Sequence, residues 1–195
     1  MPNAPKILAF AGSAREGSFN KTLVKIAAEG ARAAGAEVTY VDLRDLPMPL
    51  YDQDLEAKEG FPENVLKFKE LMMAHRGFLI ASPEYNGSIT PLLKNAIDWA
   101  SRPLPGEPPF ALSCFRDKVA VLMSASPGGL GGLRSLTHVR AILSGIAVLV
   151  LPDQQAIPNA YEAFDTDGRL KAPEQQTAIE QLGSKLATII AKLEV

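Results

Sequence analysis

The stretch "FAGSAREGSFN", from Phe10 to Asn20, decides the fold class of this sequence. It begins at the end of a short apolar run and leads into a segment whose apolar residues keep helical spacing. Two glycines, several small or hydroxyl-bearing residues and one arginine lie between the run and the helical segment. This order of strand, glycine-containing turn and helix N-terminus is typical of the first unit of a parallel α/β domain.

Apolar runs and amphipathic helical patterns alternate along the rest of the chain. The runs that suit buried strands are "KILAFAG" (6–12), "EVTYVDL" (37–43), "GFLIASP" (77–83), "KVAVLMSAS" (118–126) and "IAVLVLP" (146–152). Helical spacing relates the apolar residues of 23–31, 65–72, 92–100, 136–143 and 179–193. Strands that are apolar on both faces predict a parallel sheet covered by helices on both sides. We therefore expect a doubly wound α/β domain with right-handed crossovers.

The composition narrows the class of protein. A chain of 195 residues with 47% hydrophobic content can bury one full core, so we expect a single domain over 1–195. Its 20 basic and 22 acidic residues form no long single-sign block, which leaves no electrostatic footprint for nucleic acid or an anionic membrane. No apolar run reaches the length of a membrane span. One cysteine and the lack of a leader pattern predict a soluble cytoplasmic protein.

The opening stretch has the chemistry of a phosphate site. A helix N-terminus offers unpaired N–H groups and the positive end of a dipole, and it binds phosphate when the backbone can come close. Gly12 and Gly17 allow the turn and the approach. Hydroxyl, guanidinium and amide donors come from Ser13, Ser18, Arg15 and Asn20. The alternative, a serine- and glycine-rich turn that only caps a helix, leaves Arg15 unexplained.

Two common phosphate motifs are missing. The spacing from Gly12 to Gly17 matches a Walker A loop, but Ser18 and Phe19 stand where that motif needs Lys and Ser or Thr, which disfavours an NTPase. The G-x-G-x-x-G fingerprint of dinucleotide-binding domains is also absent after this strand. The remaining candidate ligand for this loop is the single terminal phosphate of a mononucleotide.

Two further loops follow the third and fourth predicted strands. "SPEYNGSITP" (82–91) has an irregular backbone that can present N–H and C=O groups to a flat heteroaromatic ring, and Tyr85 can pack against such a ring. "SASPGGLGGLR" (124–134) has four glycines in six positions, which suits backbone lying against a ligand. Because both loops and the first one follow parallel strands, we expect all three to converge on one crevice and to indicate a flavin.

Together, "GSAREGSFN", "PEYNGSITPLLKNAIDW" and "SPGGLGGLR" resemble the three signatures of the NADPH-dependent FMN reductase family, which includes chromate/quinone reductases and some azoreductases. The resemblance runs from about residue 6 to about 150. It implies a flavodoxin-like three-layer sandwich with a five-stranded parallel sheet in the order 2-1-3-4-5. It also implies bound FMN, with NADPH or NADH as co-substrate. The phosphate ligands it implies are Ser13, Arg15, Ser18 and Asn20; the isoalloxazine contacts are Pro83, Glu84, Tyr85, Asn86, Gly87, Ser126, Gly128 and Gly129.

The reaction that the resemblance implies is a two-step one. NADPH delivers hydride to the flavin and leaves, and a quinone, flavin, azo compound or chromate then takes two electrons at the same face. Flavin chemistry needs no catalytic side chain, and we expect none and no metal site. N–H groups of 85–88 and 126–132 can stabilise negative charge on the reduced flavin. Glu84 acts either on a proton or, as we favour, as an orienting carboxylate.

Several features keep more than one interpretation. His75 and His138 are isolated on helical segments, which favours structural or solvated roles. Arg134 and Arg140 either meet nicotinamide cofactor phosphates or are solvated.

The acidic stretch 51–64 is predicted to be an exposed connection. The proline-rich segment 101–117 is either a surface connection with its own small cluster or part of an interface or site rim.

The rival function is a flavodoxin-like single-electron carrier without nicotinamide turnover. Such carriers more often have a threonine-rich phosphate loop and a strongly acidic surface, whereas Arg15 and a net charge of -2 favour the enzyme. A flavin-binding regulatory protein is a third, weaker alternative. The family resemblance further implies a homodimer or homotetramer that acts on a small-molecule acceptor.

Overall fold

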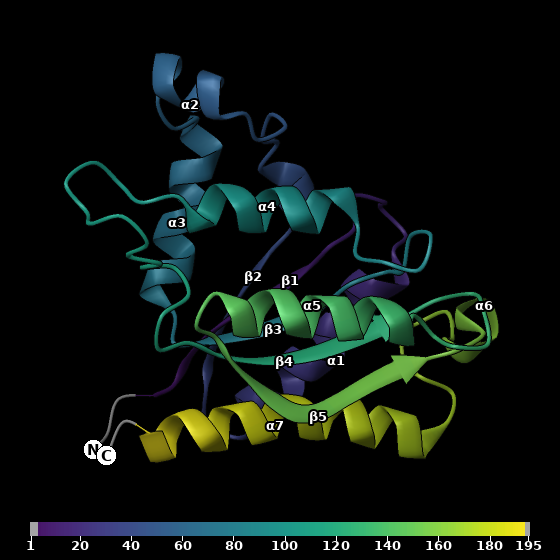
Figure 1. Cartoon of the computed structure of the whole chain (residues 1–195). Helices are drawn as coiled ribbons and strands as arrows, with labels where there is room; N and C mark the ends of the chain where they lie inside the picture. The colour runs from purple at the N-terminus through teal and green to yellow at the C-terminus, as the bar shows by residue number, and fades with distance from the viewer. Residues whose placement is uncertain (1–3, 194–195) are drawn as a thin grey trace.

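The computed structural model describes residues 4–193, and a five-stranded parallel sheet forms its centre (Figure 1). The strands are β1 (Lys6–Ala11), β2 (Glu37–Val41), β3 (Gly77–Ala81), β4 (Val119–Ala125) and β5 (Leu149–Ile157). Their spatial order is β2-β1-β3-β4-β5, and every neighbouring pair is parallel. The predicted flavodoxin-like strand order is therefore confirmed.

Helices cover both faces of the sheet. They are α1 (Phe19–Ala33), α2 (Gln53–Glu59), α3 (Glu63–Ala74), α4 (Pro91–Ser101), α5 (Leu133–Gly145), α6 (Ala160–Ala163) and α7 (Pro173–Leu193), with a 3-10 turn, η1, at Leu43–Asp45. One face packs against α1 and α7, and the other packs against α3, α4 and α5 (Figure 1). This arrangement is the predicted doubly wound sandwich.

The three central strands, β1, β3 and β4, are largely apolar because each of them supplies two separate cores. Along β1, Ile7, Ala9 and Ala11 belong to the core under α1 and α7, whereas Leu8 and Phe10 belong to the core under α3, α4 and α5. Successive side chains of a strand point to opposite faces, so a strand buried on both sides has no polar face.

The fifth strand lies further along the chain than predicted. The apolar run suggested 146–152, but the strand spans Leu149–Ile157, and Ala147 before it has a φ of 71°. The pairing register with β4 shifts between Ala120 and Leu122, so β5 bulges around Pro152 and continues through polar residues. Apolar periodicity misplaced the strand because an edge strand can be polar beyond such a bulge.

Arg140 of α5 holds this bulge in place. Its guanidinium donates to the carbonyl oxygens of Val150 (3.3 Å), Leu151 (2.8 Å) and Pro152 (3.4 Å), and to Oε1 of Gln154 (2.9 Å). The side chain is therefore a structural clamp on β5, and the suggestion that it is solvated or meets a nicotinamide phosphate is wrong.

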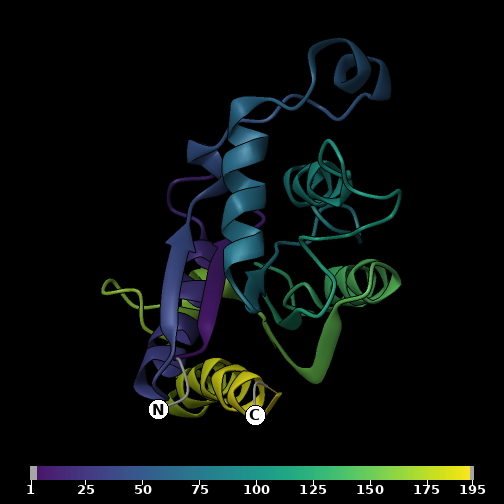
Figure 2. The same cartoon turned by 90° about the vertical axis from the view of Figure 1, so that its left-hand side faces the viewer.

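The segment 51–64 is exposed, as predicted, but it is not simply a connection. It contains α2, whose N-cap is Asp52. The Asp52 carboxylate accepts from the N–H of Asp54 at 2.8 Å. None of the α2 residues is buried by the rest of the described chain, and α2 projects from the top of the molecule (Figure 2). The helix has no apolar stripe and was missed for that reason.

The proline-rich segment contains no helix or strand after Ser101, the last residue of α4. Its side chains do not form a separate cluster, however, because Cys114 and Phe115 are fully buried in the core under α3, α4 and α5. Phe110 instead is 83% exposed. Buried Lys69 of α3 fixes the start of the segment by donating to the carbonyl oxygens of Ala100 (2.9 Å) and Arg102 (2.6 Å).

Candidate active site

Four loops meet at the edge of the sheet where the parallel strands end. They follow β1, β3, β4 and β5, and a cavity of about 190 Å3 opens between them. Its lining residues are Ser13, Arg15, Ser18, Phe19, Asn20, Pro83, Glu84, Tyr85, Ala125, Ser126, Pro127 and Tyr161. The loops after β1, β3 and β4 converge as predicted, and they do so where a doubly wound sheet places its ligand.

Three larger cavities lie away from these loops. One of about 710 Å3 lies between α1, α7 and the turn 166–169, one of about 530 Å3 lies between β5 and α7, and one of about 350 Å3 lies between α2 and residues 102–105. Charges of both signs line all three, including the ion pair of Lys185 with Asp153 at 2.5 Å. None of the three includes a residue of the three quoted motifs, so the smaller cavity carries the candidate site.

The first loop keeps a row of backbone donors free. Within residues 4–193, the N–H groups of 13–21 donate to no protein acceptor, and Ser18, the N-cap of α1, makes no side-chain cap hydrogen bond. Ser13 and Ser18 are buried, whereas Arg15 is exposed, with its guanidinium carbon 5.3 Å from the centre of the Phe19 ring. Unpaired N–H groups at a helix N-terminus can bind an anion, so this loop suits an anionic ligand.

Gly12 serves packing rather than ligand approach. Its N–H donates to the carbonyl oxygen of Ala81 at 2.8 Å, and its own carbonyl accepts from Oγ1 of Thr90 at 2.7 Å. A Cβ at position 12 would lie 2.9 Å from Cβ of Leu93. At Gly17 a Cβ would meet Nη1 of Arg15 at 3.7 Å as its nearest neighbour. The ligand approach predicted for the two glycines stays a prediction at Gly17.

Asn20 joins the first loop to the third. Its Nδ2 donates to the carbonyl oxygen of Ala125 at 2.8 Å, and its Oδ1 accepts from the N–H of Ala125 at 3.0 Å. Oδ1 is an acceptor and cannot donate to a phosphate, and one of the two N–H groups of Nδ2 already donates to Ala125. The predicted contact of Asn20 with a phosphate stays a prediction for its second N–H.

The second loop contains a tight hairpin. Tyr85 and Ser88 exchange both backbone hydrogen bonds at 3.0 Å, and the residues between them, Asn86 and Gly87, have φ values of 51° and 79°. Positive φ at both central positions defines a type I′ turn, for which Asn-Gly is the preferred pair. The N–H groups of Tyr85 and Ser88 donate inside the hairpin. Of the N–H groups of 85–88 that were predicted to stabilise a reduced flavin, only those of Asn86 and Gly87 therefore have no acceptor within residues 4–193.

Glu84 reaches across to the helix of the neighbouring loop. Its carboxylate accepts from the Arg134 side chain (Nε, 2.7 Å) and from the N–H groups of Arg134 (3.1 Å) and Ser135 (3.4 Å). The hydrogen bond from the Arg134 side chain lowers the pKa of Glu84, and burial raises it. The hydrogen bond has the larger effect, so the pKa of Glu84 lies below its ordinary value. Glu84 is therefore ionised near neutral pH, as the predicted orienting carboxylate requires.

The third loop contributes mainly its first residue. Ser126 lines the cavity, and its Oγ accepts from the N–H of Gly128 at 3.4 Å. Apart from Gly129 itself and its two chain neighbours, no described residue has a heavy atom within 4 Å of a Cβ built on Gly129. Asn86, Gly87, Gly128 and Gly129 do not line the cavity itself, so they can meet only a part of a ligand that extends beyond it.

The sequence analysis missed two aromatic residues of the cavity. Phe19 is stacked on Phe164, with ring centres 5.3 Å apart, and Tyr161 of α6 packs edge-on against Phe19 at 5.4 Å. Tyr161 follows the loop after β5, and the apolar pattern placed the end of that strand at 152 rather than at Ile157, so it predicted no ligand loop there.

Comparison with known proteins decides the family. The family model described as NADPH-dependent FMN reductase matches residues 5–162. The chain belongs to this family. A probable NADPH:quinone oxidoreductase of Oryza sativa subsp. japonica is 35% identical over 99% of this chain and 92% of its own length. An NAD(P)H-dependent FMN reductase of Pseudomonas aeruginosa is 38% identical over 90% of each chain.

The fold of this FMN reductase family member also matches solved structures. The structure of a flavoenzyme NAD(P)H:(acceptor) oxidoreductase from Paracoccus denitrificans matches with a TM-score of 0.79 at 26% identity, over 96% of this chain and 98% of that one. In the part of the chain that the structure describes, no group of three or more His, Cys, Asp or Glu residues can hold a metal ion. No described helix is long and apolar enough to cross a membrane.

Proposed function

We propose that this chain is an FMN-dependent NAD(P)H oxidoreductase that passes two electrons from NAD(P)H through bound FMN to a small acceptor. We place a quinone first, because relatives at about 35% identity are named quinone oxidoreductases, with flavins, azo compounds and chromate as further acceptors. The observation that supports this proposal best is the loop 13–21, whose N–H groups have no acceptor within the described chain.

The residues present fit the phosphate of FMN. Ser13, Ser18 and Arg15 line the cavity, so their hydroxyls and guanidinium can join the N–H groups of 13–21 in binding a phosphate. A cavity of about 190 Å3 is smaller than the sites that enclose whole cofactors. We therefore place the phosphate and the neighbouring part of the ribityl chain inside it, and the ring system outside, against the Tyr85–Ser88 hairpin and Ser126.

FMN, when bound, supplies the hydride chemistry of the reaction. The chain's own residues orient and stabilise it. The free N–H groups of Asn86 and Gly87 lie at the tip of the hairpin and can donate to a negatively charged ring edge. Tyr85 is 51% exposed beside them and offers a ring face. In this proposal Glu84 transfers no proton, because it is ionised and occupied by Arg134.

The test is anaerobic stopped-flow mixing of the FMN-loaded protein with NADPH and, separately, with NADH. We expect rapid, complete loss of the oxidised-flavin absorbance in one two-electron step, and its return on adding benzoquinone. The ratio of the two rates gives the nicotinamide preference. Tight FMN binding without loss of absorbance with either nucleotide would favour the single-electron carrier instead.

We also infer that the protein is one domain that assembles as a homodimer or homotetramer. The domain over 1–195 includes residues 1–3 and 194–195, which lie outside the described residues. The projecting helix α2 and the proline-rich segment support assembly, since Leu50 and Phe110 beside them are 80% and 83% exposed. Light scattering during size-exclusion chromatography tests it, and a monomer would contradict it. The cytoplasmic location stays a prediction.

A further inference from the structure

The Tyr85–Ser88 hairpin is attached to α5 at both of its ends. Glu84, directly before it, binds Arg134 and the first turn of α5, and Ser88, its last residue, contacts His138 one helical turn further on. A two-stranded hairpin of this size is not stable by itself in water. Its position relative to the cavity therefore depends on what holds it.

The first attachment is a buried carboxylate at a helix N-terminus. The side chain of Glu84 is 7% exposed, and it accepts from two N–H groups in the first turn of α5 as well as from the Arg134 guanidinium. Such N–H groups need an acceptor, and a carboxylate also interacts favourably with the helix dipole. This contact fixes the beginning of the hairpin.

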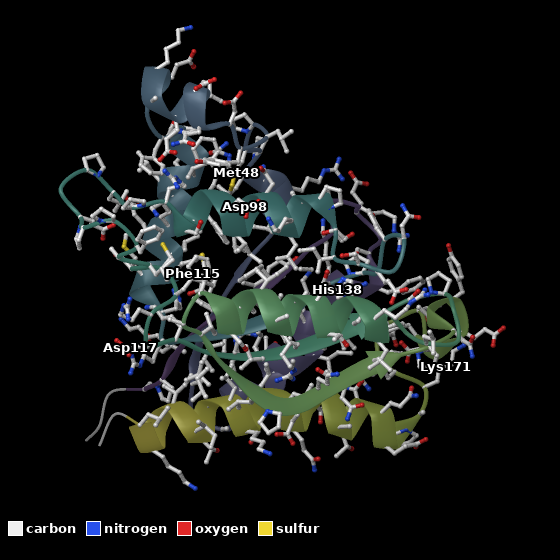
Figure 3. All side chains as sticks on the ribbon, viewed as in Figure 1. Met48, Asp98, Phe115, Asp117, His138 and Lys171 are labelled. Atoms are coloured by element: carbon white, nitrogen blue, oxygen red, sulfur yellow. The ribbon has the colours of Figure 1, made fainter. Side chains whose placement is uncertain are left out.

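The second attachment is a single hydrogen bond between two side chains. Oγ of Ser88 lies 2.8 Å from Nδ1 of His138. His138 lies on the side of α5 near the ends of the strands (Figure 3). The sequence suggested that His138 is isolated. In the structure, however, its ring is hydrogen-bonded to the hairpin. His75, in contrast, is buried, with Nδ1 2.6 Å from the carbonyl oxygen of Leu71 and Nε2 2.8 Å from Oγ1 of Thr39.

The tip of the hairpin lies between the two attachments. A Cβ on Gly87 would be 4.0 Å from Cζ and Nε of Arg134, so the guanidinium lies close to the tip. The free N–H groups of Asn86 and Gly87 can move only as far as both attachments allow. A displacement of such donors by about 1 Å weakens their interaction with a bound group strongly.

We propose that His138, through Ser88, is a positioning residue that holds the Asn86–Gly87 tip against the ring of FMN. This inference rests on the proposed function, because it takes the tip to be the flavin contact. His138 touches neither cofactor nor acceptor in this account. It acts by fixing the second end of the hairpin, whose first end Glu84 fixes.

The test compares FMN affinity among variants of the full chain. Ser88→Ala and His138→Ala each remove the hydrogen bond, and the loss of one such bond raises the Kd for FMN by about three- to tenfold. The double variant should be no weaker than either single one, since both remove the same contact. His138→Asn, which can present a polar atom near the position of Nδ1, should restore most of the affinity, whereas His138→Gln should not. Thr137→Ala, at the exposed neighbouring position of α5, is the matched control.

Two readouts separate positioning from general stability. We expect the midpoint potential of bound FMN to shift in Ser88→Ala and His138→Ala, while the urea midpoint of the apoprotein equals that of Thr137→Ala. Wild-type affinity and potential in both variants, or equal losses in Thr137→Ala, would overturn the inference while the FMN site stands. A wild-type protein that binds no FMN would overturn the proposed function and this inference with it.

Discussion

The amide of Asn20 makes two hydrogen bonds to the backbone of Ala125, a residue 105 positions later in the chain. The amide donates one bond and accepts the other, as the backbone of a neighbouring strand would do at the end of β4. It sets the distance between the start of α1 and the loop that begins at Ser126. The two sides of the cavity are thus fixed to each other by one buried side chain.

Removing this amide should therefore affect both stability and cofactor binding. Asn20→Ala leaves the N–H and carbonyl of Ala125 without partners, which should lower the free energy of unfolding by about 1–3 kcal/mol and weaken FMN binding. Asn64→Ala is the control, because the exposed Nδ2 of Asn64 also donates to a backbone carbonyl, that of Pro47, at 3.0 Å. Urea unfolding of the apoproteins measures the difference, and equal costs at the two positions would contradict it.

Arg15 should matter for the cofactor and not for the fold. Arg15→Ala removes a charge-assisted contact worth about 1.5–3 kcal/mol, which corresponds to a roughly ten- to hundredfold higher Kd for FMN. Titration with fluorescence detection measures it, together with an unchanged urea midpoint. The matched control is Arg32→Ala at the far end of α1, where the guanidinium pairs with Glu29. Unchanged FMN affinity in Arg15→Ala would argue against the phosphate site.

Gly12 should tolerate no side chain. In Gly12→Ala the new Cβ would lie 2.9 Å from Cβ of Leu93 and 3.1 Å from Oγ1 of Thr90, so the loop and α4 must separate. Such overpacking costs about 1–3 kcal/mol. Gly145→Ala, at the end of α5, places its Cβ with no described atom within 4 Å and should be neutral. Thermal unfolding compares them, and a neutral Gly12→Ala would mean that the close approach is not maintained in solution.

The buried Lys69 should be necessary for the fold. Lys69→Met leaves the carbonyl oxygens of Ala100 and Arg102 without their donor, so we expect a loss of about 2–4 kcal/mol in the free energy of unfolding. Lys67→Met on the same helix removes an exposed pair with Glu63 and should cost less than about 1 kcal/mol. Chemical unfolding of both variants decides the point. A small effect at position 69 would show that water replaces the ammonium group.

The Glu84 carboxylate should contribute stability that acid removes. Its folded-state pKa is lowered, chiefly by the hydrogen bond from Arg134, so the contribution is present above the unfolded pKa of about 4.3 and is lost as the pH falls through the folded value. Wild type should exceed Glu84→Gln in stability by the same amount from pH 7 down to about pH 5 and by progressively less toward about pH 3. A difference that grows on acidification would contradict this sign.

Local patterns predicted the sheet and the placing of the motifs. The apolar runs around Ile7 and Leu79 have two buried faces, and the loop at Gly12 follows the first of them, so a parallel sheet and the meeting of three loops were predictable. The strand order was predicted from the family resemblance alone. Contacts between residues far apart in the chain were not predictable from local patterns. The bonds of Asn20 to Ala125, of Glu84 to Arg134 and of Ser88 to His138 depend on tertiary positions that no local pattern encodes. The assignment of the predicted phosphate ligands and ring contacts to FMN stays a prediction.

The bulge in β5 has a consequence for how molecules of this protein meet. An edge strand with a regular ladder is a template on which another chain can add a strand, and this is a common route to aggregation. In β5 the bulge twists the edge, Pro152 has no N–H to donate, and Arg140 occupies three successive carbonyl oxygens. The β5 edge is therefore protected against the addition of a strand from another molecule. At high protein concentration, this protection disfavours aggregation through that edge.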